Sequence, residues 1–305
     1  MSRSHLPTLL GKINGSAYAE LIYDYYGVEL SEREKSWFAF DGKELKGSIL
    51  VGNTRGEAVA LVVRHEDRSV ARLAFFNGSK QSEVGAVRSM LKAPLVGQKC
   101  TMDALHFKPD TLIPIHLAGG TFLASLKENQ PELFAEMQFC SRQFSPSYEY
   151  KSKPEKGHGR IEQRHYWCYD VDKAYIDKRW ERANFKYLIK VKRDRTICNT
   201  NKHSEQIAYF LTNEKVQNQQ NAEELFQAIR QHWQVETANN DRDCILKEDK
   251  LRCTFTNTNR TMALCRTLAI KILNQSEIKN RCQLMEHFAD HFEQCIAFLR
   301  KINFL

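Results

Sequence analysis

Residues 98–127 read QKCTMDALHFKPDTLIPIHLAGGTFLASLK, and this stretch decides the fold class. A short apolar strand runs up to Asp103, a helix begins at Pro109, and a second strand, TFLASLK, follows the pair Gly119–Gly120. Two strands joined by a helix pair in parallel, because a crossover of this length returns the chain to the same end of the sheet. The stretch therefore predicts an α/β fold with a parallel core.

Three further strands precede this stretch. The runs WFAFDGKEL from residue 37, EAVALVVRHED from residue 57 and SVARLAFFNGS from residue 69 are separated by turn residues, which is typical of antiparallel hairpins. Residues 82–95 then place apolar side chains on one helical face. This order of elements predicts a mixed five-strand sheet, flanked by helices, in which the first and fourth strands are neighbours.

The remaining segments define the predicted domains. Residues 128–218 contain a lysine-rich stretch and three strand-like runs, which predict a β-rich insertion, and the helix NAEELFQAIRQHWQVE at 221–236 resumes the main plan. We therefore predict N-terminal helices over 1–36, one domain built from 37–127 and 219–275, the insertion over 128–218, and a C-terminal helix over 276–305.

The composition favours an anionic partner. The 305 residues include 45 Lys and Arg and 37 Asp and Glu, which gives a formal net charge of +8, a value typical of many proteins that bind nucleic acid. The nine cysteines form no CxxC pair and no zinc-ligand spacing, so we expect reduced thiols and a cytoplasmic location. No apolar run has the length of a signal peptide or of a membrane span, so we predict no membrane association.

Two carboxylates follow neighbouring strands of the predicted sheet. Asp41 ends WFAFD and Asp103 ends TMD, and sites in α/β sheets form at the carboxyl ends of strands. Carboxylates that lie close repel each other unless a cation compensates, and oxygen ligands suit Mg²⁺ or Mn²⁺ rather than zinc. Phosphodiester chemistry uses two such ions and a third acid, for which Glu236, near the end of the 221–236 helix, is the candidate.

Six motifs occur in order along the chain: DGKELKGS at 41–48, KQSEV at 80–84, TMDALH at 101–106, AGGTFLASLKENQPEL at 118–133, GHGRIEQR at 157–164 and IRQHWQVE at 229–236. As a set they resemble the DDE transposases of bacterial insertion sequences, specifically the H-repeat-associated group. The resemblance implies a ribonuclease H-like catalytic domain, DNA as the partner, two Mg²⁺ or Mn²⁺ ions, and DNA strand cleavage followed by strand transfer. It further implies a bacterial, nucleoid-associated protein and leaves a homodimer open.

The resemblance also assigns roles to single residues. It gives the metal-binding triad as Asp41, Asp103 and Glu236, in agreement with the strand positions. The basic residues at matching positions are candidate DNA contacts: Lys43, Lys127, Arg160, Arg164, Arg230 and His232.

Other residues at or near the motif positions have weaker claims. Glu162 competes with Glu236 for the third acidic place, although a salt bridge to Arg160 and Arg164 is the preferred interpretation. Asn129 and Gln130 match the motifs without an assigned role. We expect His106 and His158 in hydrogen-bonded structural positions and Trp233 in the core.

Two departures from the family pattern leave the function open. The segment before Asp41 is shorter than the family's N-terminal helical region, and Thr237 stands where the family has Asn after its catalytic Glu. The aromatic–His element that follows in the family is missing. Three functions remain: an active transposase, a truncated or co-opted relative that acts as a DNA nuclease, and a catalytically inactive DNA-binding protein.

Overall fold

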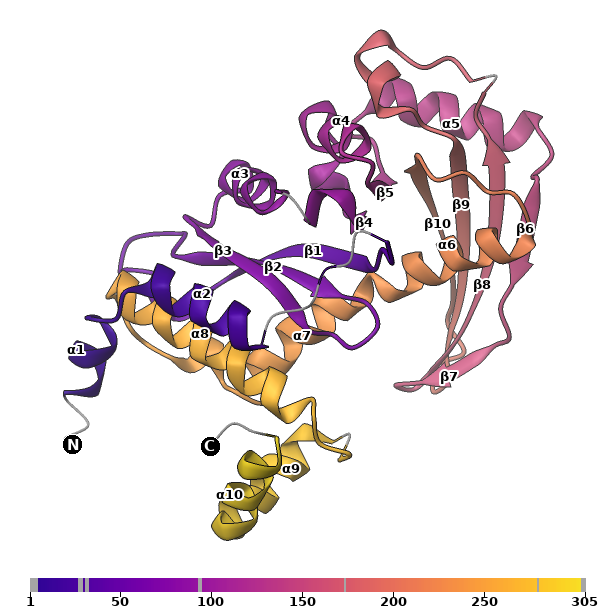
Figure 1. Ribbon diagram of the computed structural model, residues 1–305. Helices are drawn as coiled ribbons and strands as arrows, with labels where there is room; N and C mark the ends of the chain where they lie inside the picture. The colour runs from indigo at the N-terminus through magenta and orange to yellow at the C-terminus, as the bar shows by residue number, and fades with distance from the viewer. Residues whose placement is uncertain are drawn as a thin grey trace. The chain divides into compact units, whose positions relative to one another are not determined.

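The structure is a computed structural model that describes residues 5–26, 30, 33–92, 95–172, 174–278 and 280–302 (Figure 1). Its described strands form one mixed ten-stranded sheet with the order β3-β2-β1-β4-β5-β10-β9-β8-β6, and β7 pairs with β8. The strands are β1 (Trp37–Glu44), β2 (Ala58–Arg64), β3 (Val70–Phe76), β4 (Lys99–Met102), β5 (Thr121–Leu126), β6 (Tyr148–Lys151), β7 (Glu155–Gly157), β8 (Arg160–Asp170), β9 (Tyr187–Ile197) and β10 (His203–Thr212). The predicted α/β class is confirmed, but the sheet has twice the predicted number of strands.

Helices flank this sheet. They are α1 (Leu6–Leu10), α2 (Gly15–Tyr26), α3 (Lys80–Met90), α4 (Pro109–Leu117), α5 (Pro131–Gln143), α6 (Gln219–Gln231), α7 (Trp233–Cys244), α8 (Thr256–Leu273), α9 (Arg281–Asp290) and α10 (Phe292–Lys301). The helix predicted over 221–236 is two helices, α6 and α7, which meet at His232, and the predicted C-terminal helix is also two, α9 and α10. No described helix is long and apolar enough to cross a membrane.

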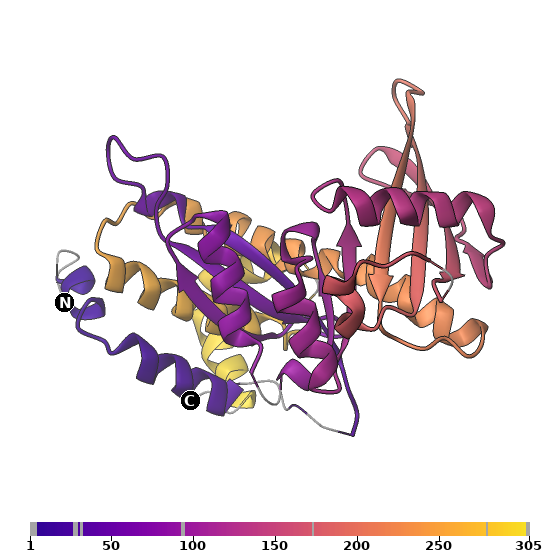
Figure 2. The same ribbon diagram turned by 90° about the horizontal axis from the view of Figure 1, so that it is seen from above.

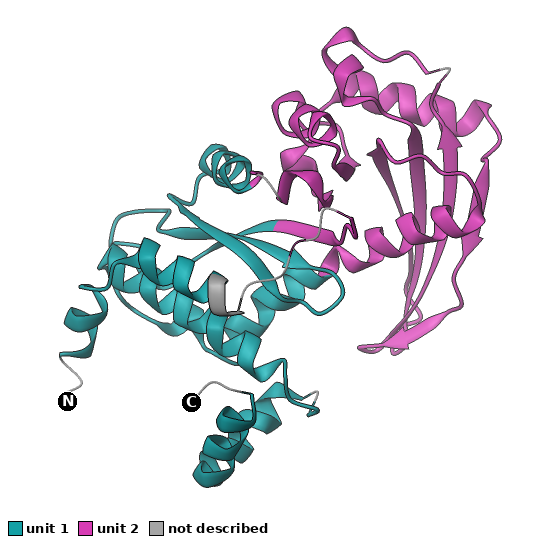
Figure 3. Ribbon diagram, viewed as in Figure 1, with its two compact units in different colours: residues 1–29, 41–90, 234–305 teal, residues 30–40, 91–233 magenta. Residues whose placement is uncertain are grey.

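The chain divides into two compact units (Figure 3). The first unit contains residues 1–29, 41–90 and 234–305, and the second contains residues 30–40 and 91–233. Strand β1 contributes its first half to the second unit and its second half to the first. The domain boundaries predicted from the sequence stay a prediction.

The second unit contains the parallel part of the sheet. Trp37 to Ala39 pair in parallel with Lys99 to Thr101, and β4 pairs in parallel with β5, which confirms the predicted parallel pairing. Strand β10 pairs antiparallel with β5, so the strands of the predicted insertion extend the sheet. Long antiparallel pairs join β10 to β9 and β9 to β8.

Helix α6 covers one part of this second-unit sheet. Its side chains Leu225 and Phe226 are buried among residues of β5, β8 and β9, including Leu123 and Ile189. The rings of Phe226 and Tyr166 stack with centroids 5.0 Å apart. This apolar contact holds α6, whose last residues belong to the motif IRQHWQVE, against the sheet.

In the first unit the hairpin of β2 and β3 lies between helices. Helix α3 packs on one face, and α2 and α8 pack on the other (Figures 1 and 2). Val87 of α3 and Leu264 of α8 are fully buried. The Tyr23 hydroxyl of α2 accepts a 2.9 Å hydrogen bond from the backbone nitrogen of Leu73 in β3, which ties this helix to the sheet.

Candidate functional site

Strand β1 and helix α7 meet through two polar contacts inside the first unit. Asn239 Nδ2 donates to Asp41 Oδ2 at 3.0 Å, and Lys43 Nζ lies 2.8 Å from Asp243 Oδ1. Asn239 and Asp243 are four residues apart on the helix, a rise of about 6 Å, and their partners Asp41 and Lys43 are two residues apart on the strand, about 6.6 Å. Because the two spacings match, β1 and α7 run side by side in the same direction at these contacts. Asp41 and Lys43 therefore share the face of β1 that meets α7.

Glu236 lies on the same face of α7. It precedes Asn239 by three residues and Asp243 by seven, which is the spacing of side chains that line one face of a helix. Along the helix axis Glu236 lies about 4.5 Å before Asn239, the residue that contacts Asp41, so it is one turn of the helix from that contact. The prediction that Glu236 lies near the end of a helix is wrong, because the break at His232 places it in the first turn of α7.

The carboxyl group of Glu236 is partly removed from water. Burial raises its pKa, although the residue as a whole stays exposed. A carboxylate that loses hydration in this way gains most from a cation beside it. The carboxylates of Asp41 and Glu236 and the Asn239 amide are oxygen donors of the kind that a hard divalent cation prefers.

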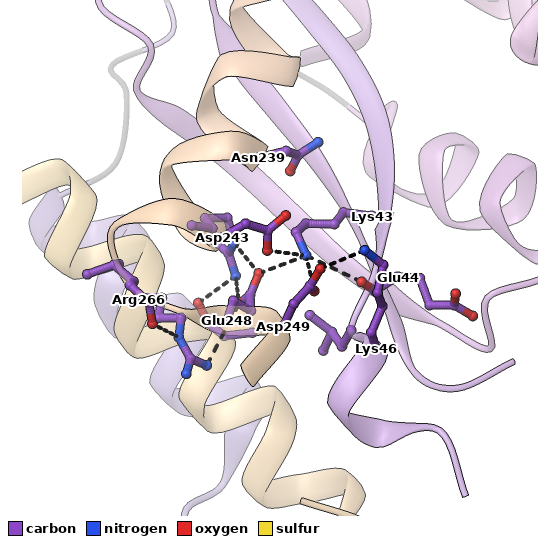
Figure 4. A network of polar contacts seen from close by, with 12 residues as sticks. Lys43, Glu44, Lys46, Asn239, Asp243, Glu248, Asp249 and Arg266 are labelled. Carbon is purple, nitrogen blue, oxygen red and sulfur yellow. Dashed lines mark hydrogen bonds and ion pairs between the residues drawn. The ribbon is translucent and has the colours of Figure 1, made fainter. Parts of the chain in front are cut away.

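A cluster of ion pairs holds this part of α7 against β1 (Figure 4). Lys43 Nζ lies 2.8 Å from carboxylate oxygens of both Asp243 and Asp249, and 3.6 Å from Glu248. Burial opposes the charged lysine, but the hydrogen bonds to Asp243 and Asp249 outweigh it and raise the Lys43 pKa. The Lys43 side chain is 8% exposed and has three carboxylates around one ammonium, so its charge is compensated within the protein and is not offered to a phosphate.

Asp103 belongs to the second unit, where it caps a short turn after β4. Its side chain accepts a 2.9 Å hydrogen bond from the backbone nitrogen of Leu105, at the start of the 3₁₀ turn Ala104–His106. Asn129 Nδ2 donates to the Ala104 carbonyl at 2.7 Å, and Gln130 Nε2 donates to the Phe107 carbonyl at 3.1 Å. The two amides that matched the motifs without a role therefore brace the turn that presents Asp103.

Two histidines lie beside Asp103. His106 is buried, with Nε2 3.9 Å from Asp103 Oδ1. His232 Nδ1 lies 2.9 Å from Thr101 Oγ1, and because the Thr101 hydroxyl donates to the Phe38 carbonyl, the imidazole Nδ1–H is the donor to Thr101. Burial lowers the pKa of His232 to about 4, so this imidazole is neutral at physiological pH and offers no charge to phosphate.

Glu162 is confirmed in the salt bridge that the sequence favoured. Its Oε2 lies 2.7 Å from Arg164 Nη2 and its Oε1 lies 3.0 Å from Arg160 Nε. Burial opposes ionisation, but the charges of Arg164 and Arg160 lower the Glu162 pKa. Arg193 and Arg195 of β9 pair with Arg164 and Glu162 across the ladder. One face of β8 and β9 thus carries several arginines around one carboxylate.

The other predicted contacts are spread over the second unit. Arg230 of α6 lies 2.8 Å from Glu155 of β7, Lys127 is exposed just after β5, and His158 adopts a positive φ of 48° in the β7–β8 turn. Trp233 is 54% exposed, so the prediction that it lies in the core is wrong. The helix break before it removes Trp233 from the face of α6 that Leu225 buries.

Among the described residues, the one group of three possible metal ligands that lie close together is on β9 and β10, and it does not include Asp41, Asp103 or Glu236. Asp194, His203 and Glu205 bring one ligand atom each within 4.8 Å of one another. The Lys192 amine already lies 2.7 Å from Glu205 and 3.4 Å from Asp194, so both carboxylates of the group have a cationic partner. The group has only a weak signal in the sequence, because Asp194 and Glu205 come together through the pairing of β9 with β10.

No protein-family model matches this chain, and a comparison with curated proteins found no match. The likeness to DDE transposases therefore depends on the six motifs alone. Sequence reasoning missed Asn239 and Asp243, whose signal is the spacing of 236, 239 and 243 on one helical face.

Proposed function

We propose that this protein is a DNA transposase-like enzyme that cleaves DNA strands and transfers them with an Asp41, Asp103 and Glu236 triad. The observation that supports it best is the hydrogen bond from Asn239 to Asp41, because α7 also carries Glu236 on the same face. The motifs DGKELKGS and IRQHWQVE are almost two hundred residues apart, yet their acids Asp41 and Glu236 lie on β1 and α7 of one compact unit. If the two acids were unrelated surface residues, there would be no reason for Asn239, on the Glu236 face of α7, to contact Asp41.

We propose a ribonuclease H-like fold for the catalytic part. In support, the first five strands have the order β3-β2-β1-β4-β5, with β2 and β3 antiparallel and β1, β4 and β5 parallel. These are the pairings that the element order predicted for a mixed sheet of this kind. The additional strands join through β10, next to β5.

Asp103 is the proposed partner of Asp41. Asp103 follows β4, and Asp41 lies in the strand β1 that pairs in parallel with β4 through Trp37 to Ala39. The proposal is that Asp103, at the carboxyl end of its strand, is the second acid of the triad, because α/β sheets form their sites at strand ends. The braced turn after β4 would present Asp103 there.

The side chains have separate tasks in the proposed reaction. Asp41, Asp103 and Glu236 would hold two Mg²⁺ or Mn²⁺ ions, which supply charge neutralisation at the phosphate and activation of the attacking oxygen. Asn239 keeps the Asp41 carboxylate in place, and the Lys43 cluster keeps α7 at β1. Water would attack one phosphate in line, and a DNA 3′-hydroxyl would attack the next.

The DNA contacts are proposed for the second unit. Arg160 and Arg164, with Arg193 and Arg195 beside them, form a basic face on β8 and β9 that suits backbone phosphates. Lys127 and Arg230 complete the proposed set. His232, which the resemblance also predicts as a DNA contact, is not included, because its Nδ1–H is used on Thr101 and its neutral Nε2 can only accept a hydrogen bond.

A plasmid assay tests this function. The wild-type protein is incubated with supercoiled plasmid and Mg²⁺ or Mn²⁺, beside Asp41→Asn, Asp103→Ala and Glu236→Gln, and a terminal-repeat oligonucleotide is added to score joining. We expect divalent-dependent nicking and joining by the wild type, lost by at least a hundredfold in each triad variant and on chelation with EDTA. Glu286→Gln and Asp172→Asn, at exposed positions, are the matched controls and should keep full activity.

The outcomes separate the alternatives. Nicking without joining would favour a co-opted nuclease, and DNA binding without nicking would favour a catalytically inactive binding protein. Nicking that survives all three triad substitutions would overturn the triad assignment.

A further inference from the structure

A further polar side chain adjoins the acids of the proposed site. Asn239 Nδ2 donates to Asp41 Oδ2 at 3.0 Å. Its other amide atom, Oδ1, is buried and has no hydrogen-bond partner in the described part of the chain. Buried polar atoms are nearly always hydrogen-bonded, so an oxygen in this position points to a partner that binds there.

Asn239 is held rigidly opposite Asp41. One turn of α7 further along, Lys43 joins β1 to Asp243 of the same helix at 2.8 Å (Figure 4). A second ion pair, between the buried Arg242 and Glu248, fixes the last turn of α7 to the segment that follows it. The amide therefore cannot swing away from β1 without breaking buried contacts.

The helix geometry brings Asn239 toward the side of Glu236. Position 239 lies about 60° round the helix from Glu236, whereas position 237, where the resemblance expects Asn, lies about 100° away in the opposite sense. Thr237 is the residue at that position here. Asn239 thus lies on the face of α7 that carries Glu236, and its contact with Asp41 joins it to the proposed site.

We propose that Asn239 is a ligand of the divalent-cation site, with its amide nitrogen holding Asp41 and its Oδ1 coordinating the cation. The inference rests on the proposed function, since it names a further ligand of the same site. Asn carbonyl oxygens join carboxylates around hard cations such as Mg²⁺ and Mn²⁺.

Two substitutions separate a ligand from a structural hydrogen bond. Asn239→Ala removes both amide atoms, whereas Asn239→Asp keeps the shape, loses the donor and adds a charged oxygen. Gln283→Ala, at an exposed position of α9, is the control. Mn²⁺ binding to the full-length protein is measured by electron paramagnetic resonance, and Tm is measured with and without Mn²⁺.

The ligand role has a distinct signature. We expect Asn239→Ala to weaken Mn²⁺ binding by about tenfold or more. Asn239→Asp should bind Mn²⁺ at least as tightly as the wild type. Its Tm without the ion should be lower, because two carboxylates then face each other, and its Tm should rise more than that of the wild type when Mn²⁺ is added. Gln283→Ala should match the wild type.

Each other result overturns a definite statement. Equal Mn²⁺ affinity in Asn239→Ala and the wild type, or equally weak affinity in Asn239→Ala and Asn239→Asp, would overturn the ligand role of Asn239 and leave the triad intact. A wild-type protein that binds no Mn²⁺, or an Asp41→Asn variant that binds it as well as the wild type, would overturn the ligand role and the proposed metal site together.

Discussion

Arg242 and Glu248 form a bidentate ion pair in the interior of the first unit. Arg242 Nε and Nη2 donate to the two Glu248 carboxylate oxygens at 2.8 and 2.7 Å, and both side chains are almost fully buried, at 1% and 2% exposure. Arg242 Nη1 also donates to Thr267 of α8 at 2.6 Å. The pair therefore connects α7, the segment after it and α8, and it supports the helix that carries Glu236.

Removal of Arg242 should destabilise the protein strongly. Arg242→Ala leaves the Glu248 carboxylate buried without its bidentate partner, which typically costs about 3–5 kcal/mol. The free energy of unfolding from urea titration measures the change, with Arg300→Ala at an exposed position as the control. A loss below about 1 kcal/mol would show that water or Lys43 compensates for Arg242.

Lys43 should have a pH-dependent effect on stability. Lys43→Met removes the ammonium between Asp243 and Asp249, so the acids beside it repel one another and their pKa values rise. When folding raises the pKa of an acid, protonation of that acid at low pH stabilises the folded state. The variant should therefore be destabilised by about 2–4 kcal/mol at pH 7 and by less at pH 4.5. Urea titrations at both pH values, beside the exposed Lys301→Met, check this, and an equal loss at both would contradict it.

His232 should make the second unit sensitive to acid. Its pKa falls from 6.5 to about 4 on folding, so the folded state binds fewer protons than the unfolded state between these values. This contribution to stability is complete above pH 6.5 and is lost as the pH falls toward 4, by about 3 kcal/mol. Urea titrations of the wild type and His232→Gln from pH 7 to pH 4 should show a shallower loss in the variant. Parallel curves would contradict the assignment.

Much of the fold was readable from local patterns. The apolar runs of β1 to β5 and the helix between β4 and β5 predicted parallel pairing, because strand and helix periods depend on neighbouring residues alone. Helix α5 was missed even though Pro131 starts it and Leu133, Met137 and Cys140 are buried at helical spacing. It lies in the segment 128–218, which is predicted to be β-rich from the strand-like runs that follow the helix.

The site was only partly readable. Asp41 and Asp103 follow apolar strands, so their positions at strand ends could be predicted. The break at His232 could not, because no Gly or Pro marks it and the apolar spacing continues through it. The hydrogen bond between Asn239 and Asp41 forms because α7 packs against β1. The burial of Arg242 and the ion pairs of Lys43 hold α7 there, and both depend on residues far apart in the sequence, so neither can be recognised from a local pattern.

Glu236 should act against stability, as expected for a carboxylate kept for function. Burial raises its pKa, so the ionised form is less favourable in the folded than in the unfolded chain, and stability is gained as the pH falls through the folded pKa. Glu236→Gln removes this charge and should leave the metal-free Tm equal to the wild type or up to about 2 °C higher, while nicking is lost. Glu286→Gln should change neither quantity. If Glu236→Gln lowers the Tm by several degrees, Glu236 instead makes a stabilising contact in the folded chain, and the loss of nicking no longer identifies it as a metal ligand.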